Sequence, residues 1–175
     1  RMVKLTLQYG FCDDSIVGFA TAGYSVFLFT ENFKLASHIS RVSESLIEES
    51  SNKHALRSRL CVELVVTLKP ITEPWHSVMA LCLELYSSSM ITGDVENAVI
   101  CRWSYCGGSF WSGALDLVTL STQYVQCIQE AAKYQQNGVS YCMMTSFTTL
   151  LHLSGTTNTD VNVKSYDELD EIGER

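Results

Sequence analysis

Seven cysteines are the most reactive side chains of this chain, and none belongs to a Cys-x-x-Cys pair. A cysteine acts as a nucleophile when a neighbouring histidine or a helix N-terminus lowers its pKa. Cys142 is the best-placed candidate, because it follows the turn signal Asn137-Gly138 and precedes His152. The odd number and the scattering through apolar segments favour small buried thiols of a reducing compartment, so we expect no catalytic residue. The seven are Cys12, Cys61, Cys82, Cys101, Cys106, Cys127 and Cys142.

The sequence motifs for a metal site and for a phosphate-binding site are also weak. Gly18 and Gly23 have the spacing of a phosphate-binding loop, but Tyr24 stands where such a loop needs a lysine. Cys101 and Cys106 would point about 140° apart on a helix, which makes a shared metal ion unfavourable. The histidines are isolated and form no His-Glu-x-x-His motif. We therefore expect no metal and no cofactor. The four histidines are His38, His54, His76 and His152.

Four aromatic residues, Trp103, Tyr105, Phe110 and Trp111, surround a glycine-rich turn expected at 106–109. Exposed tryptophan and tyrosine side chains are typical of partner-binding surfaces, so these four are the candidate partner-binding residues. The alternative is structural, because the same side chains could fill the gap between two helix hairpins. The structural alternative is the one that the sequence favours.

The 175 residues are 46% hydrophobic and 18% charged, which is a globular composition. The net charge is −7, and six acids against two bases between Asp160 and Arg175 supply more than half of it. We find no basic stripe, so nucleic-acid binding is not expected. The uncharged stretch 15–30 is too short for a membrane span and 139–159 is too polar, so no membrane partner is expected. We expect a cytoplasmic protein and interpret the chain as an excerpt of a longer polypeptide.

Apolar residues recur at steps of three and four, which predicts an all-α fold. The first segment, 2–9, could be a short strand or the tail of a helix, and Asp13, Asp14 or Ser15 could cap the helix after it. The prolines at 70 and 74 frame a rigid connector, and Asn137-Gly138 should form a turn. The expected helices are 15–30, 33–49, 53–68, 75–91, 94–104, 115–135 and 139–153.

Two junctions, 31–36 and 93–98, share a turn, an acidic or amide residue and then an alanine, and 62 residues separate them. This spacing is close to two helix-hairpin repeats, so we predict an α-solenoid of antiparallel hairpins of the tetratricopeptide kind. The repeat domain should cover 1–158, with an acidic linker or tail at 159–175. Exposed ends of such an array would allow weak self-association.

The motifs Gly93-Asp94-x-Glu96-x-Ala98 and Phe110-x-x-Gly113-x-Leu115, with Tyr124 beyond, resemble a known region. It is the degenerate helical-repeat region of large STAND-type (AAA-like) ATPase signalling proteins, which carry a histidine kinase or nucleotide cyclase domain elsewhere. The likeness extends over about 16–172, although the segment after Gly155 lacks the expected proline.

The resemblance implies a non-catalytic scaffold or sensor arm that contacts a protein or flanking domains of its own chain. The alternatives are a stand-alone peptide-binding repeat protein and an enzyme with a cysteine nucleophile.

Overall fold

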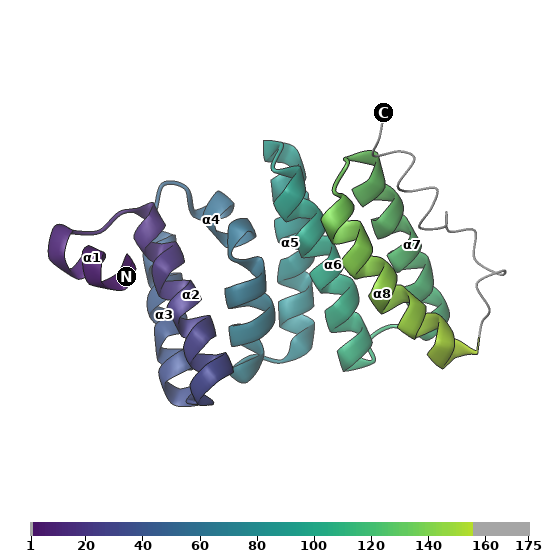
Figure 1. The fold of residues 1–175 in the computed structure, drawn as a ribbon, viewed down its shortest axis with the longest axis horizontal. Helices are drawn as coiled ribbons and strands as arrows, with labels where there is room; N and C mark the ends of the chain where they lie inside the picture. Colours follow the sequence, from purple (N-terminus) through teal and green to yellow (C-terminus); the bar gives the residue numbers. More distant parts are fainter. Residues whose placement is uncertain (1, 156–175) are drawn as a thin grey trace. The chain divides into compact units, whose positions relative to one another are not determined.

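The computed structural model describes residues 2–155, except for the side chain of Met2, and these residues are helical with no strand (Figure 1). The all-α prediction is confirmed for this part of the chain. Within it, no helix combines the length and the hydropathy of a membrane-spanning segment. The elements are α1 (Met2–Tyr9), α2 (Asp13–Thr30), α3 (Phe33–Glu49), α4 (Lys53–Arg59), the π-helix η1 (Cys61–Leu68), the 3₁₀ turn η2 (Lys69–Ile71), α5 (Trp75–Thr92), α6 (Val95–Ser112), α7 (Leu117–Lys133) and α8 (Asn137–Ser154).

The chain divides into two compact units, with the boundary between Ser104 and Tyr105. Helix α6 crosses this boundary, and each unit is described by itself. The predicted domain limits, 1–158, stay a prediction, and the acidic segment 159–175 lies outside the described residues.

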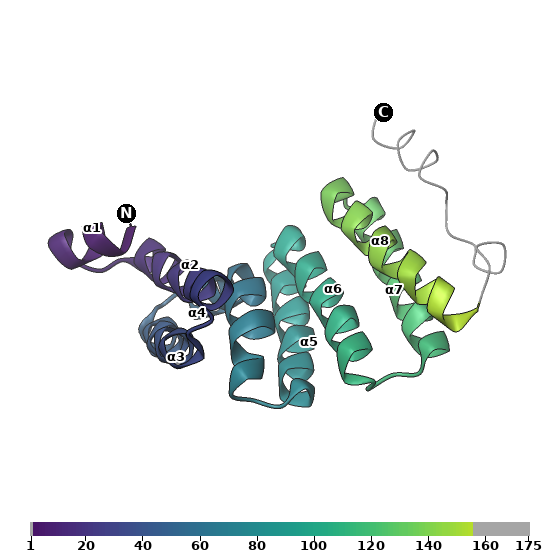
Figure 2. The ribbon, with the colours of Figure 1, turned by 60° about the horizontal axis from the view of Figure 1, so that its bottom comes forward.

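Helices α2 and α3 form the tightest hairpin of the first unit and lie side by side in both views (Figures 1 and 2). The connection is short because Glu31 adopts a left-handed conformation (φ 52°) and the Asn32 side chain accepts the Leu35 N–H at 3.1 Å. A Cβ atom on Gly23 would come within 3.0 Å of Ile39 Cγ2. Gly23 therefore serves close helix packing, and α2 runs through it without a phosphate-binding loop.

The core of the first unit combines the inner faces of α2, α3, α4 and η1. The leucines spaced by four along 53–68 all point into it, as the sequence pattern predicts. Where α4 meets α5, the Ser89 hydroxyl donates to the buried Ser58 hydroxyl at 2.6 Å, which satisfies both polar groups away from water. The core residues are Ile16, Ala20, Ala36, Ile47, Leu56, Leu60, Leu64 and Leu68.

The prediction of one regular helix over 53–68 is wrong. The α-helix ends at Arg59, Leu60 leaves helical geometry (φ −101°, ψ 18°), and a π-helix continues to Leu68. A π-helix turns less per residue than an α-helix. Side chains four residues apart therefore rotate around the helix axis in one direction along an α-helix and in the opposite direction along a π-helix. Joining them keeps Leu56, Leu60, Leu64 and Leu68 in line with one core, and we infer that this alignment favours the change of helix type.

The prediction of a glycine-rich turn at 106–109 is also wrong, because α6 is continuous from Val95 to Ser112. Two glycines in a helix interior cost about 1 kcal/mol each relative to alanine. Cys106 and Ser109, on either side of them, are fully buried, and this packing outweighs the cost. The helix predicted over 94–104 therefore extends eight residues further, to Ser112, and is followed by the left-handed Gly113 (φ 64°).

The second unit contains the hairpin of α7 and α8, whose helices lie side by side in both views (Figures 1 and 2). The Asp116 carboxylate caps α7 by accepting the Val118 and Thr119 N–H groups at 3.0 and 2.9 Å. Asn137-Gly138 was predicted as a turn, but α8 begins at Asn137 and the left-handed residue is Gln135 (φ 58°). Gly138 lies in the first turn of α8, where a missing side chain costs no packing. Its preference for a turn is therefore outweighed by formation of the helix.

Helix bounds recur along the chain. Helices α2, α5 and α8 each have 18 residues and begin at residues 13, 75 and 137, which are 62 apart each time. Each ends in a left-handed residue: Glu31 (φ 52°), Gly93 (φ 80°) and Gly155 (φ 70°). Ala36 and Ala98, which the sequence marked as equivalent, are both fully buried.

Candidate functional site

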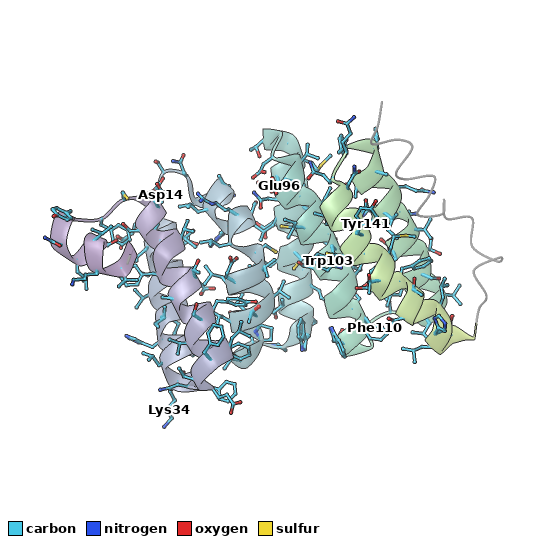
Figure 3. The ribbon with its side chains drawn as sticks, in the orientation of Figure 1. Asp14, Lys34, Glu96, Trp103, Phe110 and Tyr141 are labelled. Carbon is cyan, nitrogen blue, oxygen red and sulfur yellow. The ribbon has the colours of Figure 1, made fainter. Side chains whose placement is uncertain are left out.

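The four predicted partner-binding aromatics all lie on α6, not around a turn. Trp103 belongs to the first unit and Tyr105, Phe110 and Trp111 to the second. Figure 3 labels Trp103 and Phe110 on this helix. The Phe110 and Trp111 rings meet edge-on with centroids 5.2 Å apart, and Trp111 is 76% exposed, whereas Trp103 and Tyr105 are half-buried. A binding role for the four stays a prediction, with Trp111 the most accessible member.

Cys142 and His152 do not form a nucleophile–base pair with each other. Both are exposed on α8, and ten residues of α-helix separate them by about 15 Å along the axis. The His152 Nδ1 atom lies 2.8 Å from the Thr148 carbonyl oxygen instead. Figure 3 labels Tyr141, the residue before Cys142.

Cys12 is an exposed cysteine that lies at a helix N-terminus and has a lowered pKa. It is exposed, it is the N-cap residue of α2, and its Sγ atom lies 3.4 Å from the Ser15 hydroxyl. The hydrogen bonds of Ser15, from its side chain first and its backbone second, lower the pKa of the Cys12 thiol. Cys12 also lines a cavity of about 360 Å³ between α1 and the start of α2, near Asp14 (Figure 3). We expected Asp13, Asp14 or Ser15 as the cap; Cys12 takes that position, and Ser15 completes the capping box.

A second cavity, of about 330 Å³, lies beside α3, α4 and η2 in the first unit and is rich in charge. Lys69 Nζ is 2.8 Å from Glu44 and 2.9 Å from Glu73, while Arg57 pairs with Glu48. Burial lowers the pKa of Lys69, but the attraction of the two carboxylates outweighs it, so the pKa is raised. Since most of these charges are paired within the protein, the cavity gives no strong preference for an anion or a cation.

Three cysteines that are far apart in sequence meet in the first unit. Cys61 begins η1, Cys82 lies on α5 and Cys101 on α6, and all three are fully buried and reduced. The side chains of Cys101, Cys82 and Ser104 lower the pKa of the Cys61 thiol, and they outweigh its burial, which raises that pKa. The influence of Cys61 and, after it, burial raise the pKa of Cys82 and of Cys101. Cys61 is thus the most acidic of the three thiols.

The described residues contain no group of three or more His, Cys, Asp or Glu side chains placed to hold a metal ion. The thiol cluster of Cys61, Cys82 and Cys101 is therefore not such a group. Sequence reasoning missed it, because spacings of 21 and 19 residues carry no local signal. Cys12 could have been found from the order Cys12-Asp13-Asp14-Ser15, in which a hydroxyl three residues later completes a capping box.

Comparisons with known proteins found no matching family model, no matching curated protein and no matching solved structure.

Proposed function

We propose that this chain is a non-catalytic helical scaffold that contacts a protein partner or flanking domains of its own polypeptide. Its architecture in this proposal is a tetratricopeptide-like α-solenoid of antiparallel hairpins. The recurrence of 18-residue helices every 62 residues, each followed by a left-handed residue, supports a repeated building unit. Repeated hairpins offer extended surfaces, which suits a protein that connects others.

One observation carries the contact role. Phe29, Ile91 and Leu153 occupy the same position in the three recurring helices, two residues before the left-handed residue. They are 83%, 85% and 62% exposed. A single exposed apolar side chain is ordinary, but the same exposed position in every repeat indicates a use. Contacts with a partner would remove these side chains from water.

The resemblance to STAND-type ATPase regions extends the proposal to a cytoplasmic signalling protein. In that setting the chain would be a sensor arm, with ATPase and kinase or cyclase domains outside the present sequence. Weak self-association through exposed apolar ends belongs to the same proposal.

A stand-alone peptide-binding protein is the second candidate. Trp111 favours it, because a tryptophan that is 76% exposed and rests against Phe110 has the character of an interface anchor.

The two candidates differ in which substitution removes binding. The immobilised chain is exposed to an extract of its source cells, and bound proteins are quantified by mass spectrometry. The scaffold proposal expects Ile91→Ser to lose most of the bound partner, whereas Trp111→Ala should do so for the peptide-binding candidate. Gln129→Ser, at an exposed polar position of α7, is the matched control. Unchanged binding by Ile91→Ser, with unfolding curves that overlay, would refute the scaffold contact.

A further inference from the structure

We propose that the charged cavity of about 330 Å³ in the first unit is a binding site for a free α-amino acid with an apolar side chain. Residues of α3, α4, η1, η2 and α5 line this cavity, and its volume is at the lower end of the roughly 300–1,000 Å³ of small-molecule sites. An amino acid is small and carries one positive and one negative group, which matches a cavity lined by both signs of charge. The proposal does not depend on the scaffold role.

Arg41 supplies the contact for the carboxylate of the ligand. Three cationic side chains line the cavity, and two of them, Arg57 and Lys69, are paired with glutamates. Arg41 forms no hydrogen bond or ion pair with any residue that the structure describes. A guanidinium presents two parallel N–H donors to a carboxylate, so an unpaired arginine beside a cavity favours a ligand with that group. The Ser45 hydroxyl, four residues further along α3, also lines the cavity and adds a second donor.

Glu44 supplies the contact for the ammonium group. Its Oε1 atom lies 2.8 Å from Lys69 Nζ, and no described residue donates a hydrogen bond to its other carboxylate oxygen. Arg41 and Glu44 are one turn of α3 apart, so they lie on the same face of the helix with their Cβ atoms about 5–6 Å from each other. The carboxylate and the ammonium of an α-amino acid are attached to one carbon atom, so these two neighbouring side chains can contact both groups at once.

The apolar part of the cavity lining receives the side chain of the ligand. It consists of Ile47 from α3, Leu64 and Val65 from η1, and Leu81 from α5. Ile47, Leu64 and Val65 are buried, so the core of the first unit holds them in place. A leucine-sized ligand side chain would lose apolar contact with water against this surface, whereas glycine has no side chain to bury. We therefore expect leucine and valine to bind more tightly than glycine.

Isothermal titration calorimetry of the wild-type protein with L-leucine tests the proposal. We expect saturable binding of one leucine per chain. Two analogues separate the charges, because leucine amide keeps the ammonium without the carboxylate, and 4-methylpentanoate keeps the carboxylate without the ammonium. Each analogue should bind about tenfold more weakly than leucine or worse, since it loses a hydrogen bond between charged groups. No saturable binding at millimolar leucine, or equal binding of leucine and either analogue, would overturn the proposal.

Arg41→Gln identifies the site, because it removes the carboxylate contact at an exposed position. It should weaken leucine binding about tenfold or more and leave the weak binding of leucine amide unchanged. Lys34→Gln is the matched control, since Lys34 is an exposed cation of the same helix that does not line the cavity (Figure 3). Thermal unfolding gives a second measurement, in which leucine should raise the Tm of wild type and of Lys34→Gln but not of Arg41→Gln. Leucine binding by Arg41→Gln as tight as that of wild type would overturn the assignment.

Discussion

The close approach of α2 to its neighbours predicts an unusual outcome for Gly23→Ala. In a helix interior, alanine is more favourable than glycine by about 1 kcal/mol, so the substitution alone should stabilise the protein. Here the new Cβ atom would lie 3.0 Å from Ile39 Cγ2 and 3.3 Å from Leu68 Cδ1. Overpacking of this kind costs about 1–3 kcal/mol. We therefore expect Gly23→Ala to leave stability unchanged at best and to lower it by up to about 2 kcal/mol.

Gly107→Ala is the matched control. Gly107 also lies inside a helix, but a Cβ atom there would meet nothing within 4 Å. The same change should raise stability by about 1 kcal/mol. Urea unfolding followed by circular dichroism measures both free energies of unfolding. If Gly23→Ala raised the free energy of unfolding as much as Gly107→Ala does, the close packing of α2 at Gly23 would be refuted.

Two further predictions concern titrating groups. Ser15→Ala removes the hydroxyl that lowers the pKa of Cys12, so alkylation of Cys12 followed by mass spectrometry should require a higher pH; an unshifted pH profile would contradict this role. The pKa of Lys69 is raised above its ordinary value of 10.5, so its ion pairs stabilise the fold below that pH and stop doing so as the pH rises through the folded pKa. Thermal unfolding in alkaline buffers should show a steeper decline for wild type than for Lys69→Met, and parallel curves would disprove the effect.

Much of the helical organisation was predictable, because local signals and tertiary packing agree. The range of α3, 33–49, matches the prediction at both ends, since Asn32 caps one end and the apolar face is clear. The end of α5 before Gly93 was also predicted to within one residue, because glycine adopts the left-handed conformation without strain.

The remaining features depend on tertiary packing that no local pattern records. Glycines at 107 and 108 read as a turn, yet the burial of Cys106 keeps α6 continuous. The π-helix after Leu60 places Leu64 and Leu68 in a core assembled from distant helices. The meeting of the three thiols is likewise a product of how η1, α5 and α6 pack. The partner-binding role of the four aromatic residues on α6 stays a prediction, and Trp111 is the most exposed of them.

The most direct test of the scaffold role is photo-crosslinking at position 91 of the protein within its source cells. A benzophenone amino acid replaces Ile91, the most exposed of the three recurring apolar side chains, and in a second protein it replaces Gln129. We predict that position 91 yields a discrete crosslink, to another protein or to another domain of the same chain, and that position 129 does not. Equal and diffuse crosslinking at both positions would contradict the account.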